Sequence, residues 1–198
     1  MIGRPEIERA LTGAWRLFLD KPDALTFFDT GVDGFWRSFQ AIVLVAPCYA
    51  IAALADRVTY ADSVKAGEFN EAGFWATKAV SLCADWVALP ILLALIAGFI
   101  GIRRAYPAYI TVRNWATVLM TLPFAAIALV QVFGVSDELL FIPSLAALAF
   151  SLRFGYLIAR RTLSVGVDVA VALVALDWLV SFALVMVINR ATGYTLMS

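Results

Sequence analysis

VDVAVALVALDWLVSFALVMVIN, residues 167–189, is the stretch of the chain that decides its fold class. An α-helix rises 1.5 Å per residue, so about 20 mostly apolar residues cross the ~30 Å hydrocarbon core of a bilayer. This run has that length, and its only charged residues are Asp168 near one end and Asp177 near the middle. It therefore predicts a membrane-spanning helix that carries one acid at its centre.

Four earlier runs have the same character, and they cover residues 36–55, 77–100, 115–134 and 138–159. Of the 198 residues, 63% are hydrophobic and only 15% are charged, whereas about a quarter are charged in soluble domains. The third and fourth runs are separated by a tight GVSDE turn, which predicts an antiparallel hairpin. We expect an all-α, polytopic transmembrane bundle of about five spans, formed by residues 35–198.

Residues 1–34 form a separate segment that is too charged to span a membrane. Its apolar residues recur at helical spacing and predict one face of an amphipathic helix, made of Ile7, Leu11, Trp15 and Phe18. Glu6, Arg9, Gly13, Arg16 and Asp20 fall on the opposite face. Such a helix either lies on the cytoplasmic membrane surface with its aromatic rings in the interface, or packs on its own bundle or on a partner. Residues 23–34 then lead as an interfacial turn into the first span.

The distribution of basic residues predicts the orientation in the membrane, because positively charged flanks stay in the cytoplasm. With the N-terminus inside, the cytoplasmic flanks hold Arg4, Arg9, Arg16, Lys21, Arg37, Arg103, Arg104, Arg113, Arg153, Arg160 and Arg161. The outer flanks then hold only Arg57, Lys65, Lys78 and Arg190. We therefore expect the N-terminus inside and the C-terminus outside. No cleavable signal precedes the first span, which is expected to direct its own insertion.

Composition argues against several classes of function. The 15 basic and 15 acidic residues balance, so no cationic surplus is present to bind nucleic acid. The chain has no histidine, and its two cysteines, Cys48 and Cys83, lie in apolar runs, so neither a metal nor a cofactor is expected. Residues Asp29, Asp33, Gly34 and Arg37 resemble the start of the CDP-alcohol phosphotransferase signature, but its later glycine and two further aspartates are missing. We expect no catalysis.

Charged residues at membrane depth are the strongest candidates for a functional site, because each costs roughly 2.5–3.5 kcal/mol to insert unless it is paired or hydrated. These are Asp85, Arg153 and Asp177. Helical rise places Arg153 and Asp177 at similar depths, which predicts an ion pair between them. Asp85 is expected to reach water through a cavity or to pair with Lys78. The set is either a proton or ion relay, or a structural pair with a solvated acid.

Small residues repeat every four positions in two spans, a pattern that lets helices approach closely. The fourth span carries Ala147, Ser151 and Gly155, and the second carries Ala94 and Gly98. Prolines lie within the first three spans, at Pro47, Pro90 and Pro123. Each either kinks its helix and helps to open a cavity, or is simply tolerated, as is common in membrane helices.

The order of these features resembles that of a known family. An amphipathic segment with a proline, WRLFLDKPDALTFF, precedes a first span that begins with tryptophan, and RNWATVLMTLPFAAIALV is followed by a short turn and LRFGYLIARRTL. In layout over residues 10–189 this is similar to bacterial members of the Yip (Rab-GTPase-interacting) family of five-span membrane proteins. The resemblance implies an N-inside, C-outside plan and a role in membrane organisation or as an accessory to other membrane proteins.

Two functions are therefore expected from the sequence. The first is a small scaffold or accessory protein in a bacterial cytoplasmic (inner) membrane, with lipid and other membrane proteins or its own copies as partners. The alternative is a small permease or ion-coupled carrier that uses Asp85, Arg153 and Asp177.

Overall fold

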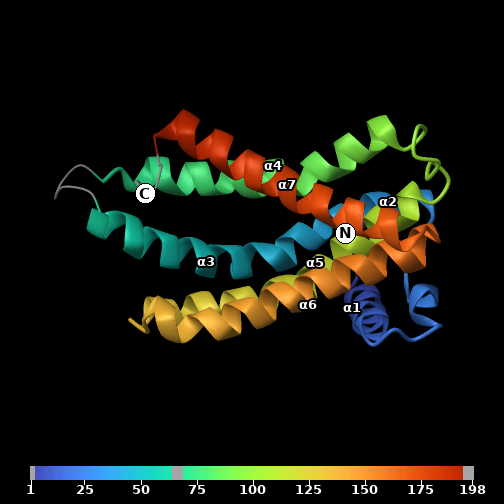
Figure 1. Ribbon diagram of the computed structural model, residues 1–198, viewed down its shortest axis with the longest axis horizontal. Coiled ribbons are helices and arrows are strands. Elements are labelled where there is room, and N and C mark those ends of the chain that lie inside the picture. Colours follow the sequence, from blue (N-terminus) through green and yellow to red (C-terminus); the bar gives the residue numbers. More distant parts are fainter. Residues whose placement is uncertain (1–2, 64–68, 194–198) are drawn as a thin grey trace.

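The computed structural model describes residues 3–63 and 69–193, and within these ranges it is helical without any β-strand (Figure 1). Its elements are α1 (Arg4–Phe18), η1 (Ala24–Phe27), α2 (Val32–Ser38), η2 (Phe39–Ala41), α3 (Ile42–Ser63), α4 (Glu71–Ile96), α5 (Tyr106–Val132), α6 (Asp137–Leu163) and α7 (Val167–Thr192). The last four, together with the continuous helical stretch Val32–Tyr60, are long and apolar enough to cross a membrane. The predicted all-α bundle with five spans is confirmed.

The helices extend beyond most of the predicted spans because helical ends at an interface are polar and fall outside a hydrophobic window. α5 begins at Tyr106 rather than at residue 115, with Pro107 in its first turn, where a missing N–H does no harm. α4 begins at Glu71, and the side chain of Asn70 caps it by accepting a hydrogen bond from the Gly73 N–H at 3.0 Å. Arg113 therefore lies two turns inside α5.

α5 is the central helix of the bundle. Its most extensive contacts are with α3 and α6, and α1 and α2 also pack against it. The α5–α6 contact confirms the predicted antiparallel hairpin. α4 packs mainly on α7, and α7 also contacts α6.

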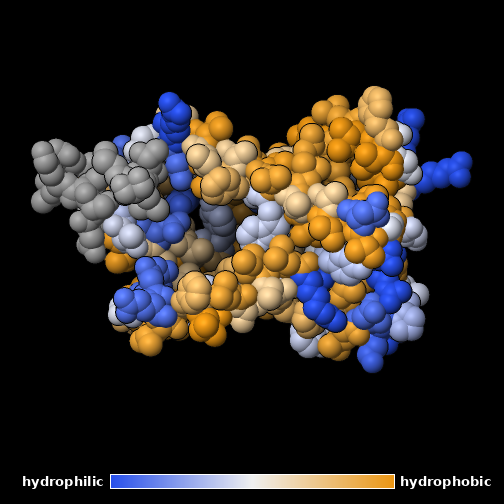
Figure 2. All heavy atoms as spheres, viewed as in Figure 1, coloured by the Kyte–Doolittle hydropathy of each residue, from blue (hydrophilic) through white to orange (hydrophobic). Residues whose placement is uncertain are grey.

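The two ends of the bundle differ in how tightly they are packed. Every residue from 109 to 116 in α5 is buried, whereas α5 beyond residue 118 is exposed on one side. We call the end that carries α1, α2 and the α4–α5 and α6–α7 connections the closed end, and the opposite one the open end. In Figure 1 the long helices converge at the closed end and diverge toward the open end, and Figure 2 shows a hollow between the diverging halves.

α1 packs across the closed end and appears almost end-on in Figure 1. The side that it buries consists of Ala10, Gly13, Ala14 and Leu17. The prediction that Gly13 lies on the polar face is wrong: a Cβ there would lie 2.6 Å from the Phe27 Cβ, so the glycine permits close contact with η1. Ile7, Leu11 and Phe18 are partly buried, while Trp15 stays 50% exposed. The helix therefore packs on its own bundle, and its position relative to the membrane surface stays a prediction.

Candidate functional site

The centre of the bundle contains an ion pair between α5 and α7. Arg113 donates hydrogen bonds from Nη2 to Asp177 Oδ1 at 2.7 Å and from Nε to Asp177 Oδ2 at 3.2 Å. The two side chains are 11% and 26% exposed. This two-point geometry is the one in which a guanidinium and a carboxylate match best, and it leaves a locally neutral group.

The predicted pair between Arg153 and Asp177 is wrong. α6 turns Ser151 and Gly155 toward α7, and because successive residues rotate by about 100° around a helix, Arg153 points away from that side. Its guanidinium lies 4.8 Å from the centre of the Phe18 ring and donates to the Phe18 carbonyl at 2.5 Å. Arg153 therefore holds the end of α1 instead of joining the intramembrane site.

Asp85 lies on α4, midway along the bundle. Its expected partner Lys78 pairs instead with Asp56 on α3, at 2.5 Å. The Asp85 Oδ1 atom is buried and has no hydrogen-bond partner in the described part of the chain. A carboxylate oxygen without a partner at this depth is strongly disfavoured, so it needs water, a proton or a bound group.

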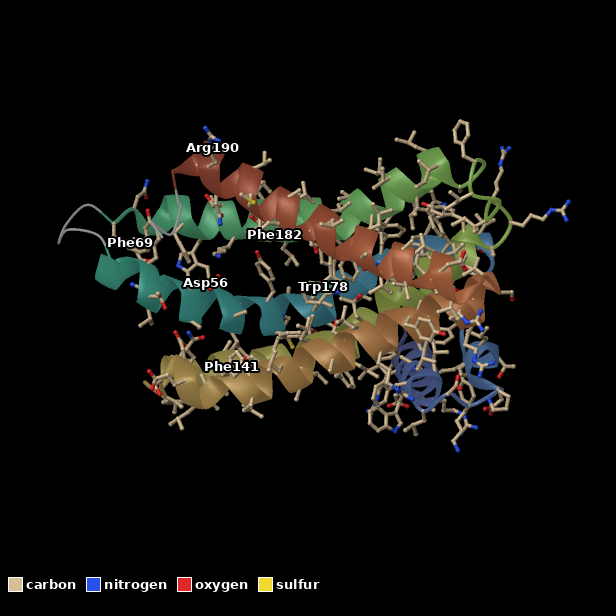
Figure 3. All side chains as sticks on the ribbon, viewed as in Figure 1. Asp56, Phe69, Phe141, Trp178, Phe182 and Arg190 are labelled. Atoms are coloured by element: carbon tan, nitrogen blue, oxygen red, sulfur yellow. The ribbon has the colours of Figure 1, made fainter. Side chains whose placement is uncertain are left out.

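Asp85 and the ion pair line one cavity of about 260 Å³ between α4, α5, α6 and α7. Its remaining lining combines hydroxyl and apolar side chains: Thr117, Met120, Thr121, Phe124, Ser151, Trp178 and Ser181. Figure 3 places Trp178 near the middle of the molecule, with Asp56 and Arg190 nearer the open end. The structure thus brings Asp85 and Asp177 together in one space, but it adds Arg113 and leaves Arg153 outside.

The chemistry of this cavity favours a small polar or cationic solute. The Arg113–Asp177 pair is internally balanced, so an ionised Asp85 gives the site one net negative charge. The serine and threonine hydroxyls both donate and accept hydrogen bonds, and the surrounding low-dielectric protein strengthens each interaction. Among residues 3–63 and 69–193, no three His, Cys, Asp or Glu side chains lie close enough to hold a metal ion.

The small-residue faces behave differently in the two spans. In α6, Ala147 and Ser151 are buried, and a Cβ added at Gly155 would lie 3.3 Å from Val174 of α7. Ala94 in α4 is exposed, and nothing lies within 4 Å of a Cβ added at Gly98, which lies just beyond the end of α4. The face predicted for the second span therefore makes no close contact within the described bundle, and its role in packing stays a prediction.

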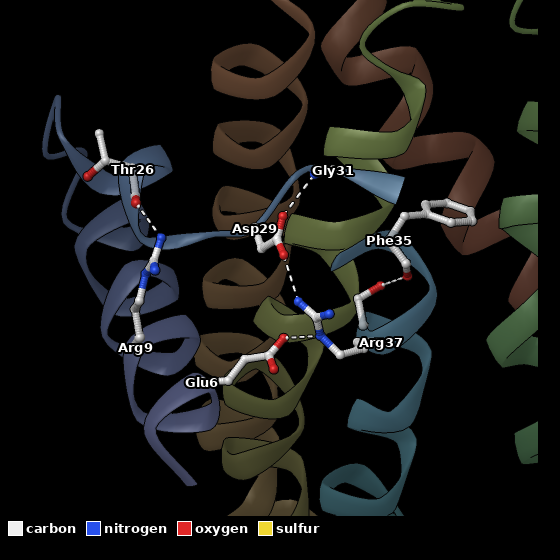
Figure 4. Close-up of polar contacts among 8 residues, drawn as sticks. Glu6, Arg9, Thr26, Asp29, Gly31, Phe35 and Arg37 are labelled. Atoms are coloured by element: carbon white, nitrogen blue, oxygen red, sulfur yellow. Dashed lines mark hydrogen bonds and ion pairs between the residues drawn. The ribbon is translucent and has the colours of Figure 1, made fainter. Parts of the chain in front are cut away.

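Asp29 and Arg37, two of the residues that resemble the start of the phosphotransferase signature, belong to a structural cluster at the closed end (Figure 4). Arg37 bridges Glu6 of α1 at 2.9 Å and Asp29 at 2.6 Å. A Cβ at Gly34 would lie only 2.0 Å from the Asp29 main-chain oxygen, so the glycine lets α2 approach this loop.

A second ion pair fixes the loop that follows α1. Arg16 donates to both carboxylate oxygens of Asp23 at 2.6 Å, which lowers the pKa of that carboxyl below its usual value. The Arg16–Asp23 pair joins α1 to the loop that follows it, and Arg37 joins both α1 and this loop to α2.

Two polar residues of α5 were missed by reasoning from sequence. Arg113 was counted as a flanking charge because the third span was started at residue 115. Asn114 is fully buried and donates from Nδ2 to Ser38 Oγ at 3.0 Å, which joins α5 to α2. The Tyr106-Pro107 pair was the available signal, because proline favours the first turn of a helix and would have moved the start of the span.

The remaining sequence predictions concern the cysteines and one outer-flank lysine. Cys48 and Cys83 are both free, and Cys83 is exposed on α4 rather than buried. Lys65, counted among the outer flanks, lies outside the described residues.

Comparison with protein-family models, with curated proteins and with solved structures finds no match for this chain.

Proposed function

We propose that this multi-pass membrane protein binds a small polar or cationic solute in the cavity at Asp85 and Asp177, and acts without catalysis as a small permease or ion-coupled carrier. The observation that carries the proposal is the buried Asp85 Oδ1 atom, which has no partner among the described residues although it borders a cavity of about 260 Å³. Arg113 replaces Arg153 as the third member of the set.

The packing of the bundle supports this proposal. Side chains fill the closed end around residues 109–116, whereas the bundle diverges beyond it (Figure 1). A polar cavity that borders diverging helices requires water or a solute, because lipid cannot satisfy its hydrogen-bonding groups. A site that is blocked on one side and open on the other is what one state of an alternating-access carrier requires.

The proposed location is the cytoplasmic membrane of a bacterium, with the N-terminus inside and the C-terminus outside. The bias of basic residues toward the closed end supports this orientation. The cavity would then open toward the outside of the cell.

Reaction with a thiol reagent that cannot cross membranes tests whether water reaches the cavity from outside. In a background without Cys48 and Cys83, the variants Thr121→Cys and Ser181→Cys place a thiol on the cavity lining. Both should react in intact cells, because only a hydrated thiol forms the reactive thiolate. Leu179→Cys is the matched control: Leu179 is 64% exposed on α7, does not line the cavity, and should face lipid and stay unreacted.

Failure of both cavity cysteines to react in folded protein would contradict an outward-open cavity. Reaction only after the cytoplasmic side is made accessible would reverse the proposed orientation while retaining the cavity.

A scaffold or accessory role, the role that a Yip-type plan implies, is the second candidate, and it is favoured by the exposure of α7. Only 6% of the most apolar stretch of α7 is buried, against 28% in each of the other four spans. A span that gains so little contact from its own bundle offers an apolar face to another membrane protein or to a second copy.

Mass spectrometry of the protein extracted directly into lipid nanodiscs separates the two candidates. A small molecule that is retained by the wild type and by Asp168→Asn, but lost from Asp85→Asn, supports the solute-binding proposal. A stoichiometric membrane protein without any small molecule supports the accessory role and overturns the first proposal.

A further inference from the structure

A basic cavity at the closed end is independent of the intramembrane site. It lies where the C-terminus of α6 meets the turn after α1, and its volume is about 340 Å³, within the range of small-ligand pockets. Its lining is mainly polar: Asp20, Tyr156, Leu157, Arg160, Arg161, Ser164 and Val165.

The side chains of this cavity are arranged by the two chain segments that form it. Arg161 donates to Asp20 Oδ1 at 2.7 Å and so ties α6 to the turn after α1. Arg160 donates to the Val165 carbonyl and closes the last turn of α6. Asp20 and Ser164 both have a left-handed backbone, with φ of 56° and 52°, so each segment reverses direction at the cavity.

The charge around the cavity is positive on balance. Two arginines line it against one carboxylate, and Lys21 follows Asp20 directly in the sequence. The C-terminus of α6 adds a partial negative charge of about one half, which the second arginine exceeds. An anion is therefore the ligand that this corner favours.

The neighbouring apolar side chains indicate that the anion belongs to a lipid. Trp15 and Leu19, near the end of α1, are 50% and 47% exposed, and Leu19 directly precedes the cavity residue Asp20. In a membrane protein, exposed tryptophan and leucine beside arginines mark the level where acyl chains give way to headgroups. Basic pockets between helices on the cytoplasmic side are suited to phospholipid headgroups.

We propose that this cavity binds the headgroup phosphate of an anionic phospholipid from the leaflet that surrounds the closed end. Arg160 and Arg161 neutralise the phosphate, the Tyr156 and Ser164 hydroxyls donate to its oxygens, and the acyl chains lie along Trp15 and Leu19. Bound lipid would thereby hold the end of α1 against α6.

The test is native mass spectrometry of the full-length protein with added phosphatidylglycerol or phosphatidylcholine. The wild type should retain phosphatidylglycerol in preference. Because each basic residue near an anionic surface contributes about a fivefold gain in affinity, Arg160→Gln/Arg161→Gln should bind phosphatidylglycerol about 30-fold more weakly. Arg103→Gln/Arg104→Gln removes the same charge from the α4–α5 connection at the same end. Because neither residue lines the cavity, this control should change binding by less than about twofold.

A second variant covers the case in which the double substitution does not fold. Ser164→Asp places a carboxylate in the cavity without removing either arginine, and aspartate tolerates the left-handed backbone of this position. It should weaken phosphatidylglycerol binding about fivefold, the effect of one charge.

Three results would overturn the proposal. These are retention of phosphatidylglycerol by folded Arg160→Gln/Arg161→Gln or by Ser164→Asp at the wild-type level, an equal loss in the Arg103→Gln/Arg104→Gln control, and binding of inorganic phosphate with no preference between the two lipids. The last would assign the cavity to a free phosphate.

Discussion

At the scale of single residues, the Arg113–Asp177 pair removes two isolated charges from the middle of the bundle. Replacing both partners of a buried pair with apolar side chains is often nearly neutral, whereas removing one partner costs about 3–5 kcal/mol because the other charge is left uncompensated. The pair therefore makes each of its members dependent on the other.

Asp177→Asn should lower the free energy of unfolding by about 3 kcal/mol, because it leaves Arg113 charged and without its carboxylate. Arg113→Met/Asp177→Leu should recover most of that loss. Unfolding in mixed micelles followed by circular dichroism provides the measurement. Arg153→Gln is the control, because it removes an arginine outside the pair. It should lower the free energy of unfolding by about 1 kcal/mol, the typical effect of a point mutation.

A stable Asp177→Asn variant, or a larger loss in Arg153→Gln than in Asp177→Asn, would show that the ion pair does not stabilise the bundle.

The two acids at membrane depth could be read from the sequence, but the arginine that pairs with Asp177 could not. Asp85 and Asp177 stand out because they interrupt long apolar runs. Pairing depends on where a helix begins and how it is rotated about its axis. An early start of α5 brings Arg113 inside the bundle, and the rotation of α6 takes Arg153 out of it. Neither property is visible in hydropathy.

At the scale of elements, glycine determines how closely α2 approaches the loop before it. The missing Cβ of Gly34 leaves room for the Asp29 carbonyl, and the same loop supplies the Asp29 carboxylate that pairs with Arg37. The contact between α1 and η1 depends in the same way on Gly13. Close backbone contacts at these two glycines therefore help to hold the N-terminal segment together, in addition to the burial of its apolar side chains.

Gly34→Ala should destabilise the N-terminal segment by about 1–3 kcal/mol, because a Cβ 2.0 Å from a main-chain oxygen forces α2 away from the loop. Gly98→Ala is the matched control, since its Cβ would meet nothing within 4 Å. Limited proteolysis between α1 and α2 reports the effect. Equal cleavage of the two variants would contradict the close approach.

The existence of each long helix followed from hydropathy alone, but the faces that they present did not. Repeats of small residues were equally good packing candidates in the second and fourth spans, and only the α6 repeat lies against another helix. A repeat of small residues allows another helix to approach closely, but whether a helix lies there depends on the tertiary packing.

At the scale of the whole molecule, five spans carry the two ends of the described chain toward opposite ends of the bundle (Figure 1). The basic residues are concentrated at the closed end, which is also the end that carries α1. Hydropathy predicted this plan because the length and apolarity of a span are properties of sequence alone.

A reporter that is active only in the cytoplasm should give a signal when it is fused before Met1 and none when it is fused after Ser198. The reason is the excess of basic flanks on the side of the N-terminus. Fusions in the α4–α5 connection after Gly101 and in the α5–α6 turn after Gly134 serve as internal controls and should be active and inactive, respectively. An active C-terminal fusion would contradict the orientation.

The order in which the chain is made gives the ion pair a consequence for biogenesis. Arg113 leaves the ribosome 64 residues before Asp177, so the third span enters the membrane while its counter-charge is still unsynthesised. Until then Arg113, which lies two turns from the start of α5, would have to extend its long side chain to the nearby headgroups. Insertion of α7 would supply the carboxylate and draw the guanidinium inward. Formation of the ion pair therefore has to wait for translation of α7.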